Sequence, residues 1–313
     1  MTALALAKQQ SNQGLEEDVF IPRASEQFVV TEQVASVCRR AMAYLDAGYA
    51  VHLAGPSGIG KTTLAFHLAS QLEQPAVLMQ GNHELGASEI LGKETGYRRS
   101  RVVDNYIHSV MKTEEEMREF WVENRLARAC RKGYTLIYDE FNRSPPEANN
   151  VLLSVLEERL LNLPAASDQG YVKVSPKFRA IFTSNPEEYA GTHQTQDALL
   201  DRMITIRLRP LTRKAEVDVV AKRSGLDGRR VAMIQAVVAA MRQEEAIEHL
   251  LSIRTTVAIA KVVARQEIDP WVDKGYFEAI CRDCILSASH HLSEEEYQAL
   301  GQRLAQRIEE ERQ

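Results

Sequence analysis

The chain has 313 residues, of which 44% are hydrophobic and 26% charged, a balance typical of a globular protein long enough for two domains. Its 38 basic and 43 acidic residues give a formal net charge of -5, which excludes a general electrostatic attraction to nucleic acid. Its four scattered cysteines exclude a disulfide framework, and no segment approaches the roughly 18 uninterrupted apolar residues of a membrane span.

The N-terminal segment shows neither a leader nor a regular element. The apolar run in "MTALALAKQQ" is short and its lysine follows it, so we expect no signal peptide and a cytoplasmic location. Residues 1–24 lack sustained periodicity, which predicts a flexible tail. A helix is predicted over residues 31–48, with Ala41 and Leu45 at helical spacing and Gly48 as its stop.

Five short runs of β-forming residues follow: "YAVHLA", "PAVLMQ", "YTLIYDE", "FRAIFTS" and "MITIRLR". Helical patterns separate most of them, and this alternation predicts a parallel sheet with helices on both faces. After Pro210 the remaining segments show helical periodicity and no strand pattern. We therefore expect an α/β domain over residues 25–210, followed by an all-helical domain over residues 211–313.

The stretch "GPSGIGKT", residues 55–62, matches the pattern G-x-x-x-x-G-K-[ST]. Its glycines let backbone N–H groups approach phosphate oxygens, and the helix that follows directs the positive end of its dipole at the same anions. Lys61 is expected to reach the β- and γ-phosphates of ATP, and Thr62 to supply a hydroxyl to Mg²⁺. The predicted nucleotide-binding residues are Gly55, Pro56, Ser57, Gly58, Ile59, Gly60, Lys61, Thr62 and Thr63.

Two carboxylates end the third β-like run. A run of this kind is buried inside a sheet, so its C-terminal end places Asp139 and Glu140 at the ligand-binding edge. Asp139 then suits support of Mg²⁺ together with Thr62, and Glu140 suits polarising an attacking water. The phosphate loop upstream disfavours the alternative, a strand end whose acids are merely solvated.

Asn185 ends the fourth run, in "FRAIFTSNP". Its side chain suits holding the attacking water near the γ-phosphate, but an Asn before a proline also favours a simple turn. Local sequence leaves both interpretations open.

Capping boxes predict the starts of two further helices. Ser144 and Glu147 open the segment "SPPEANNVLLSVLEERL", and Thr113 and Glu116 open "TEEEMREFW".

Several motifs together resemble one family. The phosphate loop, "LIYDEFNRSPPEANNVLLSVLEE", "FTSNP", "LLDR" and "SIRTT" are similar to those of the AAA+ ATPases, specifically the MoxR-like branch, over about residues 26–265. Within that branch, "GYRRSRVVDNYIHSVMKTEEEMREFW" is similar to the ATPases of gas vesicle systems. The resemblance implies a P-loop αβα sandwich with a five-stranded parallel sheet, a C-terminal helical lid, and hydrolysis of ATP with Mg²⁺ in a ring, a hexamer.

The resemblance also implies roles for four residues. Asn185 corresponds to the sensor asparagine, and Arg202 to the arginine finger that reaches a neighbouring subunit's nucleotide. Arg254 corresponds to the second sensor, placed on the γ-phosphate by the lid, and Arg143 to a position found at subunit contacts. By local chemistry alone each arginine would more often be a solvated surface charge.

Two insertions fit the MoxR-like pattern, one around residues 95–112 and a hairpin over residues 163–176. In related rings such elements face the central pore or the client protein. The first contains the basic and aromatic segment "GYRRSR", for which client contact and a solvated loop both stay open.

The leading interpretation is an ATP-hydrolysing ring that remodels or assembles a protein client of the gas vesicle shell system, in the cytoplasm or associated with gas vesicles. One alternative is a MoxR-type activator of a metalloenzyme, which only the identity of the client distinguishes. A nucleic-acid motor or loader is disfavoured by the negative net charge. A binding module that does not hydrolyse is disfavoured because Glu140, Asn185 and Arg202 accompany the loop.

Overall fold

The computed structural model describes residues 18–26, 28–86, 90–103, 113–163, 170–185, 197–247, 251–287 and 292–312, and the side chains of residues 92–103 and 113–123 lie outside this description. By their contacts the residues fall into two compact units.

The first unit contains the described residues up to Ala24, Cys38–Ala54 and Thr62–Arg207, and the second contains Ser25–Val37, Gly55–Lys61 and Leu208–Gln313. The phosphate loop is therefore grouped with the C-terminal helices, although it lies between two elements of the α/β part of the chain. The domain boundaries expected near residues 25 and 210 follow chain order instead, and they stay predictions.

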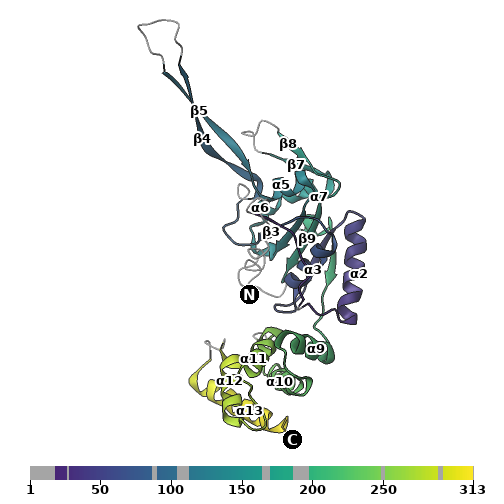
Figure 1. Ribbon diagram of the computed structural model, residues 1–313, viewed down its shortest axis with the longest axis vertical. Coiled ribbons are helices and arrows are strands. Elements are labelled where there is room, and N and C mark those ends of the chain that lie inside the picture. The colour runs from purple at the N-terminus through teal and green to yellow at the C-terminus, as the bar shows by residue number, and fades with distance from the viewer. Residues whose placement is uncertain are drawn as a thin grey trace. The chain divides into compact units, whose positions relative to one another are not determined.

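A six-stranded sheet in the order β1-β3-β6-β9-β2-β10 forms the centre of the first unit (Figure 1). The five predicted strands are present as parallel neighbours: β2 (Ala50–Ala54), β3 (Ala76–Gln80), β6 (Thr135–Asp139), β9 (Arg179–Ser184) and β10 (Met203–Arg207). Strands β2 and β6 are buried along their whole length, which explains their predominantly apolar sequences.

The sixth strand, β1 (Val19–Phe20), corrects the expectation of a five-stranded, fully parallel sheet. It pairs antiparallel with β3, and both of its residues are buried. The ring of Phe20 also packs on that of Phe66, with the ring centroids 5.6 Å apart. The expected flexible tail therefore includes two residues of the sheet. Two residues are too few to show an alternating pattern, so a strand at this position could not be predicted.

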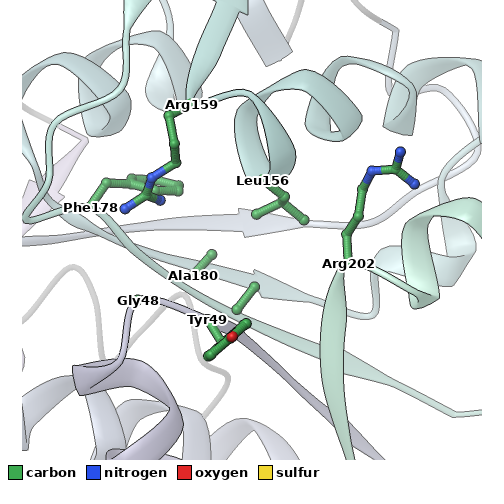
Figure 2. A pocket seen from close by; sticks show the side chains of 8 residues that line it. Gly48, Tyr49, Leu156, Arg159, Phe178, Ala180 and Arg202 are labelled. Atoms are coloured by element: carbon green, nitrogen blue, oxygen red, sulfur yellow. The ribbon is translucent and has the colours of Figure 1, made fainter.

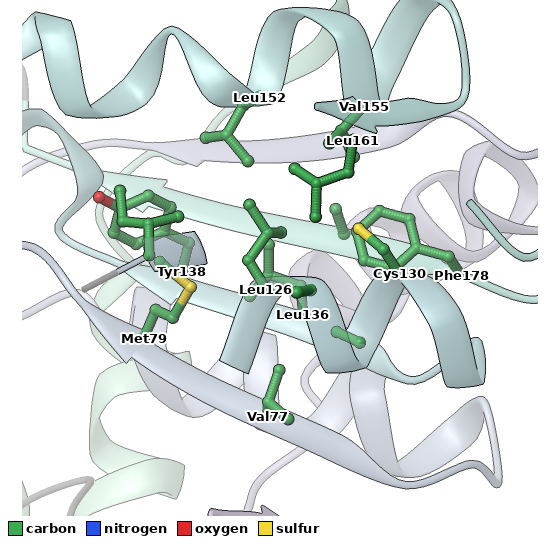
Figure 3. Packing of buried hydrophobic residues seen from close by; sticks show 14 of the residues in the cluster. Val77, Met79, Leu126, Cys130, Leu136, Tyr138, Leu152, Val155, Leu161 and Phe178 are labelled. Atoms are coloured by element: carbon green, nitrogen blue, oxygen red, sulfur yellow. The ribbon is translucent and has the colours of Figure 1, made fainter. Parts of the chain in front are cut away.

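Helices supply the rest of the first unit's core. These are α2 (Glu32–Asp46), α3 (Lys61–Gln71), α5 (Arg125–Lys132), α6 (Pro146–Asn149), α7 (Val151–Glu157) and α8 (Asp197–Leu200), together with the 3₁₀ turn η1 (Phe141–Arg143). Figure 3 shows Leu126 of α5 and Leu152 and Val155 of α7 packed with Leu136 and Tyr138 of β6. This packing holds β6, which ends at the predicted acid pair, in the middle of the sheet.

The segment predicted as one capped helix forms the two short helices α6 and α7. The hydroxyl of Ser144 does not cap them: it accepts a hydrogen bond from the buried Tyr138 hydroxyl, at 2.8 Å. Pro145 occupies the N-cap position, without a side-chain hydrogen bond. The capping-box prediction is therefore wrong: the helix starts one residue later than predicted, with Pro145 and not Ser144 at its N-cap.

Two small antiparallel sheets accompany the main sheet. In one, β4 (Gly92–Val103) pairs with β5 (Thr113–Glu123); in the other, β7 (Leu160–Asn162) pairs with β8 (Tyr171–Lys173). The second is a hairpin as predicted, but its first strand, β7, precedes the predicted range of residues 163–176. Residues 164–169 of this hairpin and residues 104–112 of the first insertion lie outside the described residues.

Strand β5 overturns the predicted helix at Thr113. A capping box favours only a first helical turn, whereas here β4 offers a partner along the whole segment, with Arg101 opposite Glu115 in the register. Pairing with a neighbouring strand overrides the local signal.

The second unit contains five helices in its described residues: α9 (Arg213–Ser224), α10 (Gly228–Met241), α11 (Ile253–Arg265), α12 (Lys274–Leu286) and α13 (Glu294–Glu310). They share an apolar core in which Ile234, Ile259, Phe277 and Leu304 are fully buried. Helix α13 lies within the expected all-helical domain, although its start was not predicted. Over the described part of the chain, no helix has both the length and the apolar character that crossing a bilayer requires.

Candidate functional site

The phosphate loop connects β2 to α3. Gly58 and Gly60 have φ angles of +79° and +92°, a left-handed conformation that glycine adopts without strain. The Nζ of Lys61 donates to the carbonyl oxygens of Gly55, at 2.8 Å, and Pro56, at 2.7 Å. The loop therefore closes around the ammonium group of Lys61, and Lys61 is also the first residue of α3. The first N–H groups of that helix have no intrahelical acceptor, so they are available to an anion.

The apex of this loop lies directly against α11. A Cβ atom built on Gly58 would lie 2.5 Å from the Cβ of Ser252 and 2.6 Å from its Oγ, so only glycine fits. Ser252 caps α11, its hydroxyl accepting a hydrogen bond from the backbone N–H of Arg254 at 3.2 Å. The predicted second sensor, Arg254, is the second residue of α11 and lies two residues after Ser252, which contacts the phosphate loop.

A chain of hydrogen bonds connects α3, β6 and β9 at the carboxyl edge of the sheet, by which we mean the side where its parallel strands end. The Thr62 hydroxyl donates to both carboxylate oxygens of Asp139, at 2.8 and 3.0 Å. The Thr183 hydroxyl donates to Oδ1 of Asp139 at 2.5 Å and accepts from the backbone N–H of Glu140 at 2.9 Å. Asp139 is 6% exposed and Thr183 fully buried. These bonds fix the acid pair relative to the first turn of α3.

Thr183 was missed from the sequence. The sequence does contain a signal for it: Thr183 is a polar residue near the end of the run "FRAIFTS", whose strand β9 neighbours the strand that ends at the acid pair.

Glu140 has a strained backbone. Its φ of +53° is left-handed, which costs a non-glycine residue about 1 kcal/mol or more and is concentrated at functional sites. Gly81 makes this conformation possible, because a Cβ there would lie 2.0 Å from the Glu140 carbonyl oxygen. The side chain of Glu140 forms an ion pair with Nε of Arg143, at 3.1 Å. The structure therefore connects Arg143 with the acid pair of its own chain.

Asn185 lies at the same edge as Asp139, because β6 and β9 are parallel neighbours and both residues stand at strand ends. It is 6% exposed, and its carbonyl oxygen accepts a hydrogen bond from the Asn142 side chain at 3.1 Å. The burial and this fixed backbone favour a placed polar group over a solvated turn residue.

His52 of β2 braces the two strands beside it. Its ring nitrogens lie 2.8 Å from Oγ of Ser184 in β9 and 3.0 Å from Oγ1 of Thr205 in β10. Burial lowers the pKa of His52 to about 4, so the ring is neutral at physiological pH and serves as a hydrogen-bonding bridge.

Arg202 lies on the opposite side of the sheet, where the parallel strands begin, which we call the amino edge. Strand β10 runs parallel to β2, with Met203 beside Ala50 and Arg207 beside Ala54, so Arg202 stands where these strands begin. The phosphate loop follows Ala54, where β2 ends. Five strand residues separate the two levels by about 16 Å. The structure therefore does not bring Arg202 to the carboxyl edge of its own chain.

The guanidinium of Arg202 is bound by groups near the end of α7 and in α8. Its Nε donates to Oε2 of Glu157 at 2.7 Å, a second nitrogen donates to the same oxygen, and the third donates to the carbonyl oxygen of Ala198. Figure 2 shows Arg202 at one side of a hollow that also exposes Tyr49 and Arg159.

Comparisons with known proteins agree with this architecture. A family model described as AAA domain (dynein-related subfamily) matches residues 50–203. The chain is 46% identical to the Gas vesicle ATPase GvpN of Ancylobacter aquaticus, over 85% of this chain and 75% of that protein. It is 40% identical to the GvpN of Haloferax mediterranei (86% and 76%) and 22% identical to Protein NorQ of Paracoccus denitrificans (89% and 93%).

Among solved structures, the Thermotoga maritima RuvB Holliday junction branch migration motor aligns with a TM-score of 0.50 at 18% identity. The alignment covers 88% of this chain and 76% of the RuvB chain, and at this identity it shows a likeness of fold alone.

The fold and the phosphate loop define a P-loop ATP hydrolase of the AAA+ class, in its MoxR-like branch, as the sequence motifs predicted. Within this class, the identity to its relatives over most of their length shows that the chain belongs to the GvpN family of gas vesicle ATPases.

Proposed function

We propose that the protein hydrolyses ATP within a homo-oligomeric ring, a hexamer, and uses this reaction to remodel or assemble a protein client in gas vesicle formation. The observation that supports this most is the buried chain of hydrogen bonds from Thr62 through Asp139 and Thr183 to Glu140. It places a hydroxyl, a carboxylate and a candidate base together at the edge to which β2 and the phosphate loop lead.

The residues of the loop fit a triphosphate with Mg²⁺. Glycines at the turn leave no Cβ between backbone N–H groups and an anion, and Lys61 adds an ammonium group that would hold the β- and γ-phosphates. Thr62 and Asp139 offer oxygen ligands, which Mg²⁺ prefers, and they would hold the ion. When bound, Mg²⁺ neutralises charge on the phosphate oxygens.

Glu140 and Asn185 are proposed to act on the attacking water. Both stand at the carboxyl edge, on neighbouring parallel strands, and the strained backbone of Glu140 fixes the direction in which its side chain leaves β6. Glu140 would accept the proton of the water while Asn185 holds its oxygen. The ion pair with Arg143 constrains the Glu140 carboxylate on its other side.

The two remaining arginines are proposed to act from different subunits. Arg254 belongs to the same chain's site, since its helix begins beside the phosphate loop. Arg202 stands at the amino edge and is proposed to serve the nucleotide of a neighbouring copy. A guanidinium that completes another subunit's site makes hydrolysis depend on the assembled ring.

Client contact is assigned to the hairpin of β4 and β5. It forms a two-stranded sheet separate from the main one, and its strands carry a basic run opposite an acidic run, with Arg101 facing Glu115 in the register. The names of the GvpN relatives place this family with gas vesicles, so the proposed client is a shell or accessory protein of that system. No nucleic acid or membrane partner is proposed.

The test is a nucleotide-dependent trap. Glu140→Gln should bind ATP without turning it over, hold its client, and co-purify from the native host with gas vesicle proteins. Lys61→Ala, which removes the ammonium group of the loop, is the matched control that should lose both ATP and client. Recovery of a metalloenzyme in place of gas vesicle proteins would favour the alternative activator function, and recovery of the same proteins with Lys61→Ala would contradict an ATP-dependent client complex.

A further inference from the structure

A solvent-open hollow lies at the amino edge of the main sheet, within the first unit. Two arginines line it, Arg159 after the end of α7 and Arg202 before β10. Figure 2 shows them on either side of Leu156, with Tyr49 of the segment before β2 across the hollow. The hollow is thus a basic site on the side of the sheet away from the chain's own phosphate loop.

The two guanidinium groups differ in what they contact. That of Arg202 is bound to Glu157 and to the carbonyl oxygen of Ala198. The side chain of Arg159 is half-buried, and within the described part of the chain it makes no hydrogen bond or ion pair. Burial and the nearby Arg179 guanidinium lower the pKa of Arg159. A partly desolvated cation beside another cation, with no carboxylate to compensate it, favours the binding of an anion.

The backbone conformation of Arg159 also supports an anion-binding role. Its φ is +57°, and it stands just past the end of α7, a position where glycine is the unstrained residue. Glu73 and Glu267 have the same left-handed conformation beyond other helices, but both are exposed. At Arg159 the strain instead accompanies a side chain that lines the hollow.

We propose that Arg159 is a second cation acting in trans, and that together with Arg202 it binds the terminal phosphates of the ATP held by a neighbouring copy of this chain. The inference rests on the proposed function, in which Arg202 reaches across a subunit boundary. A closed ring uses one heterologous interface, so the amino edge of one copy faces a different surface of the next. The surface that complements two guanidinium groups is the carboxyl edge, with its triphosphate. Two cations there would neutralise more transition-state charge than one.

The decisive variant is Arg159→Gly, because glycine suits the backbone and removes only the side chain. Its melting temperature should equal or exceed that of the wild-type chain, while kcat for ATP falls by about 100-fold, as for loss of one preorganised donor, and KM for ATP stays unchanged. The matched control Glu267→Gly relieves the same backbone conformation at an exposed site and should leave turnover unchanged. Arg159→Lys, which keeps the charge but not the planar fork, should recover part of kcat. Wild-type turnover by Arg159→Gly would overturn the proposal.

Mixed rings show in which subunit the arginine acts. Subunits with Arg159→Gly retain an intact acid pair, and subunits with Glu140→Gln retain Arg159, so mixing the two should restore turnover above that of either alone. The same mixture is made in parallel with Arg202→Ala. Rescue of Arg202→Ala without rescue of Arg159→Gly would overturn the role of Arg159 alone. Rescue of neither would overturn this inference together with the trans arrangement on which it rests.

Discussion

The two edges of the main sheet are organised in opposite ways. At the carboxyl edge, polar groups of the same chain satisfy one another: the Thr183 hydroxyl donates to the Asp139 carboxylate and accepts from the backbone N–H of Glu140. At the amino edge, half-buried guanidinium groups of Arg159 and Arg202 line an open hollow, and only Arg202 has a carboxylate partner among the described residues. The first edge is preorganised within one chain, whereas the second offers positive charge to another molecule. Substitutions at the first edge should therefore act in cis, and substitutions at the second in trans.

The largest effect is expected from Arg202→Ala. Loss of a transition-state cation should lower turnover by about 1,000-fold, because neither the chain's own Lys61 nor Arg254 replaces a group that acts from a neighbour. Steady-state hydrolysis measures this. Glu157→Gln, which frees Arg202 from its ion pair but keeps the guanidinium, is the control and should retain most of the turnover. Equal losses in both variants would mean that the ion pair, and not the trans contact, is what matters.

Glu140→Gln should lower turnover by about 100-fold while ATP binding persists, because a candidate general base is lost without any change in the phosphate loop. Nucleotide binding by equilibrium titration and hydrolysis under saturating ATP separate the two. The exposed acid Glu147, changed to Gln, is the control. Undiminished hydrolysis would exclude Glu140 as the water-activating group. It would also contradict the expectation that the carboxyl edge serves the nucleotide of its own chain.

Thr183→Val should lower kcat by about tenfold with little change in KM, since the variant loses a hydrogen bond to a carboxylate worth roughly 1.5 kcal/mol. Thr183→Ser, which keeps the hydroxyl, should restore kcat. Thr135→Val is a matched control: it removes another fully buried threonine hydroxyl from the same sheet, at the start of β6 and away from the acid pair. If the two valine variants behaved alike, Thr183 would have only a general role in stability.

The smallest effect at neutral pH concerns His52, which connects β2 to both neighbouring strands. Its folded pKa of about 4 lies below its ordinary value of 6.5, so the unfolded chain binds the proton first as the pH falls. The unfolding free energy should therefore decrease between pH 6.5 and 4, by at most about 1.4 kcal/mol per pH unit from this group. Denaturant titrations of His52→Gln should show a shallower slope, and the exposed His83→Gln should not. Identical slopes for wild type and His52→Gln would contradict the bridging role.

Much of the carboxyl edge could be predicted because its signals are local. The loop pattern, the five apolar runs and the acid pair each occupy a few consecutive residues, and the parallel arrangement then brings strand ends together. Thr183 escaped prediction because its partners, Asp139 and Glu140, come from another strand. The hollow at the amino edge escaped for the same reason, since Arg159 and Tyr49 are far apart in sequence and line one hollow only in the folded chain.

Two errors in the fold concern the starts of helices. The helix expected at Thr113 was a local signal that pairing with β4 overrode, and the cap expected at Ser144 lies one residue before the N-cap that the structure has, Pro145. Helix α13 shows the reverse: Ser293 and Glu296 form a complete capping box, a local signal that was present in the sequence and not used.

The contact between Gly58 and Ser252 leaves no free space between the phosphate loop and the start of α11, whose second residue is Arg254. A methyl group does not fit between Gly58 and Ser252, so a shift of the phosphate loop towards α11 displaces the start of that helix. The conformation of the loop and the position of the first residues of α11 are therefore coupled.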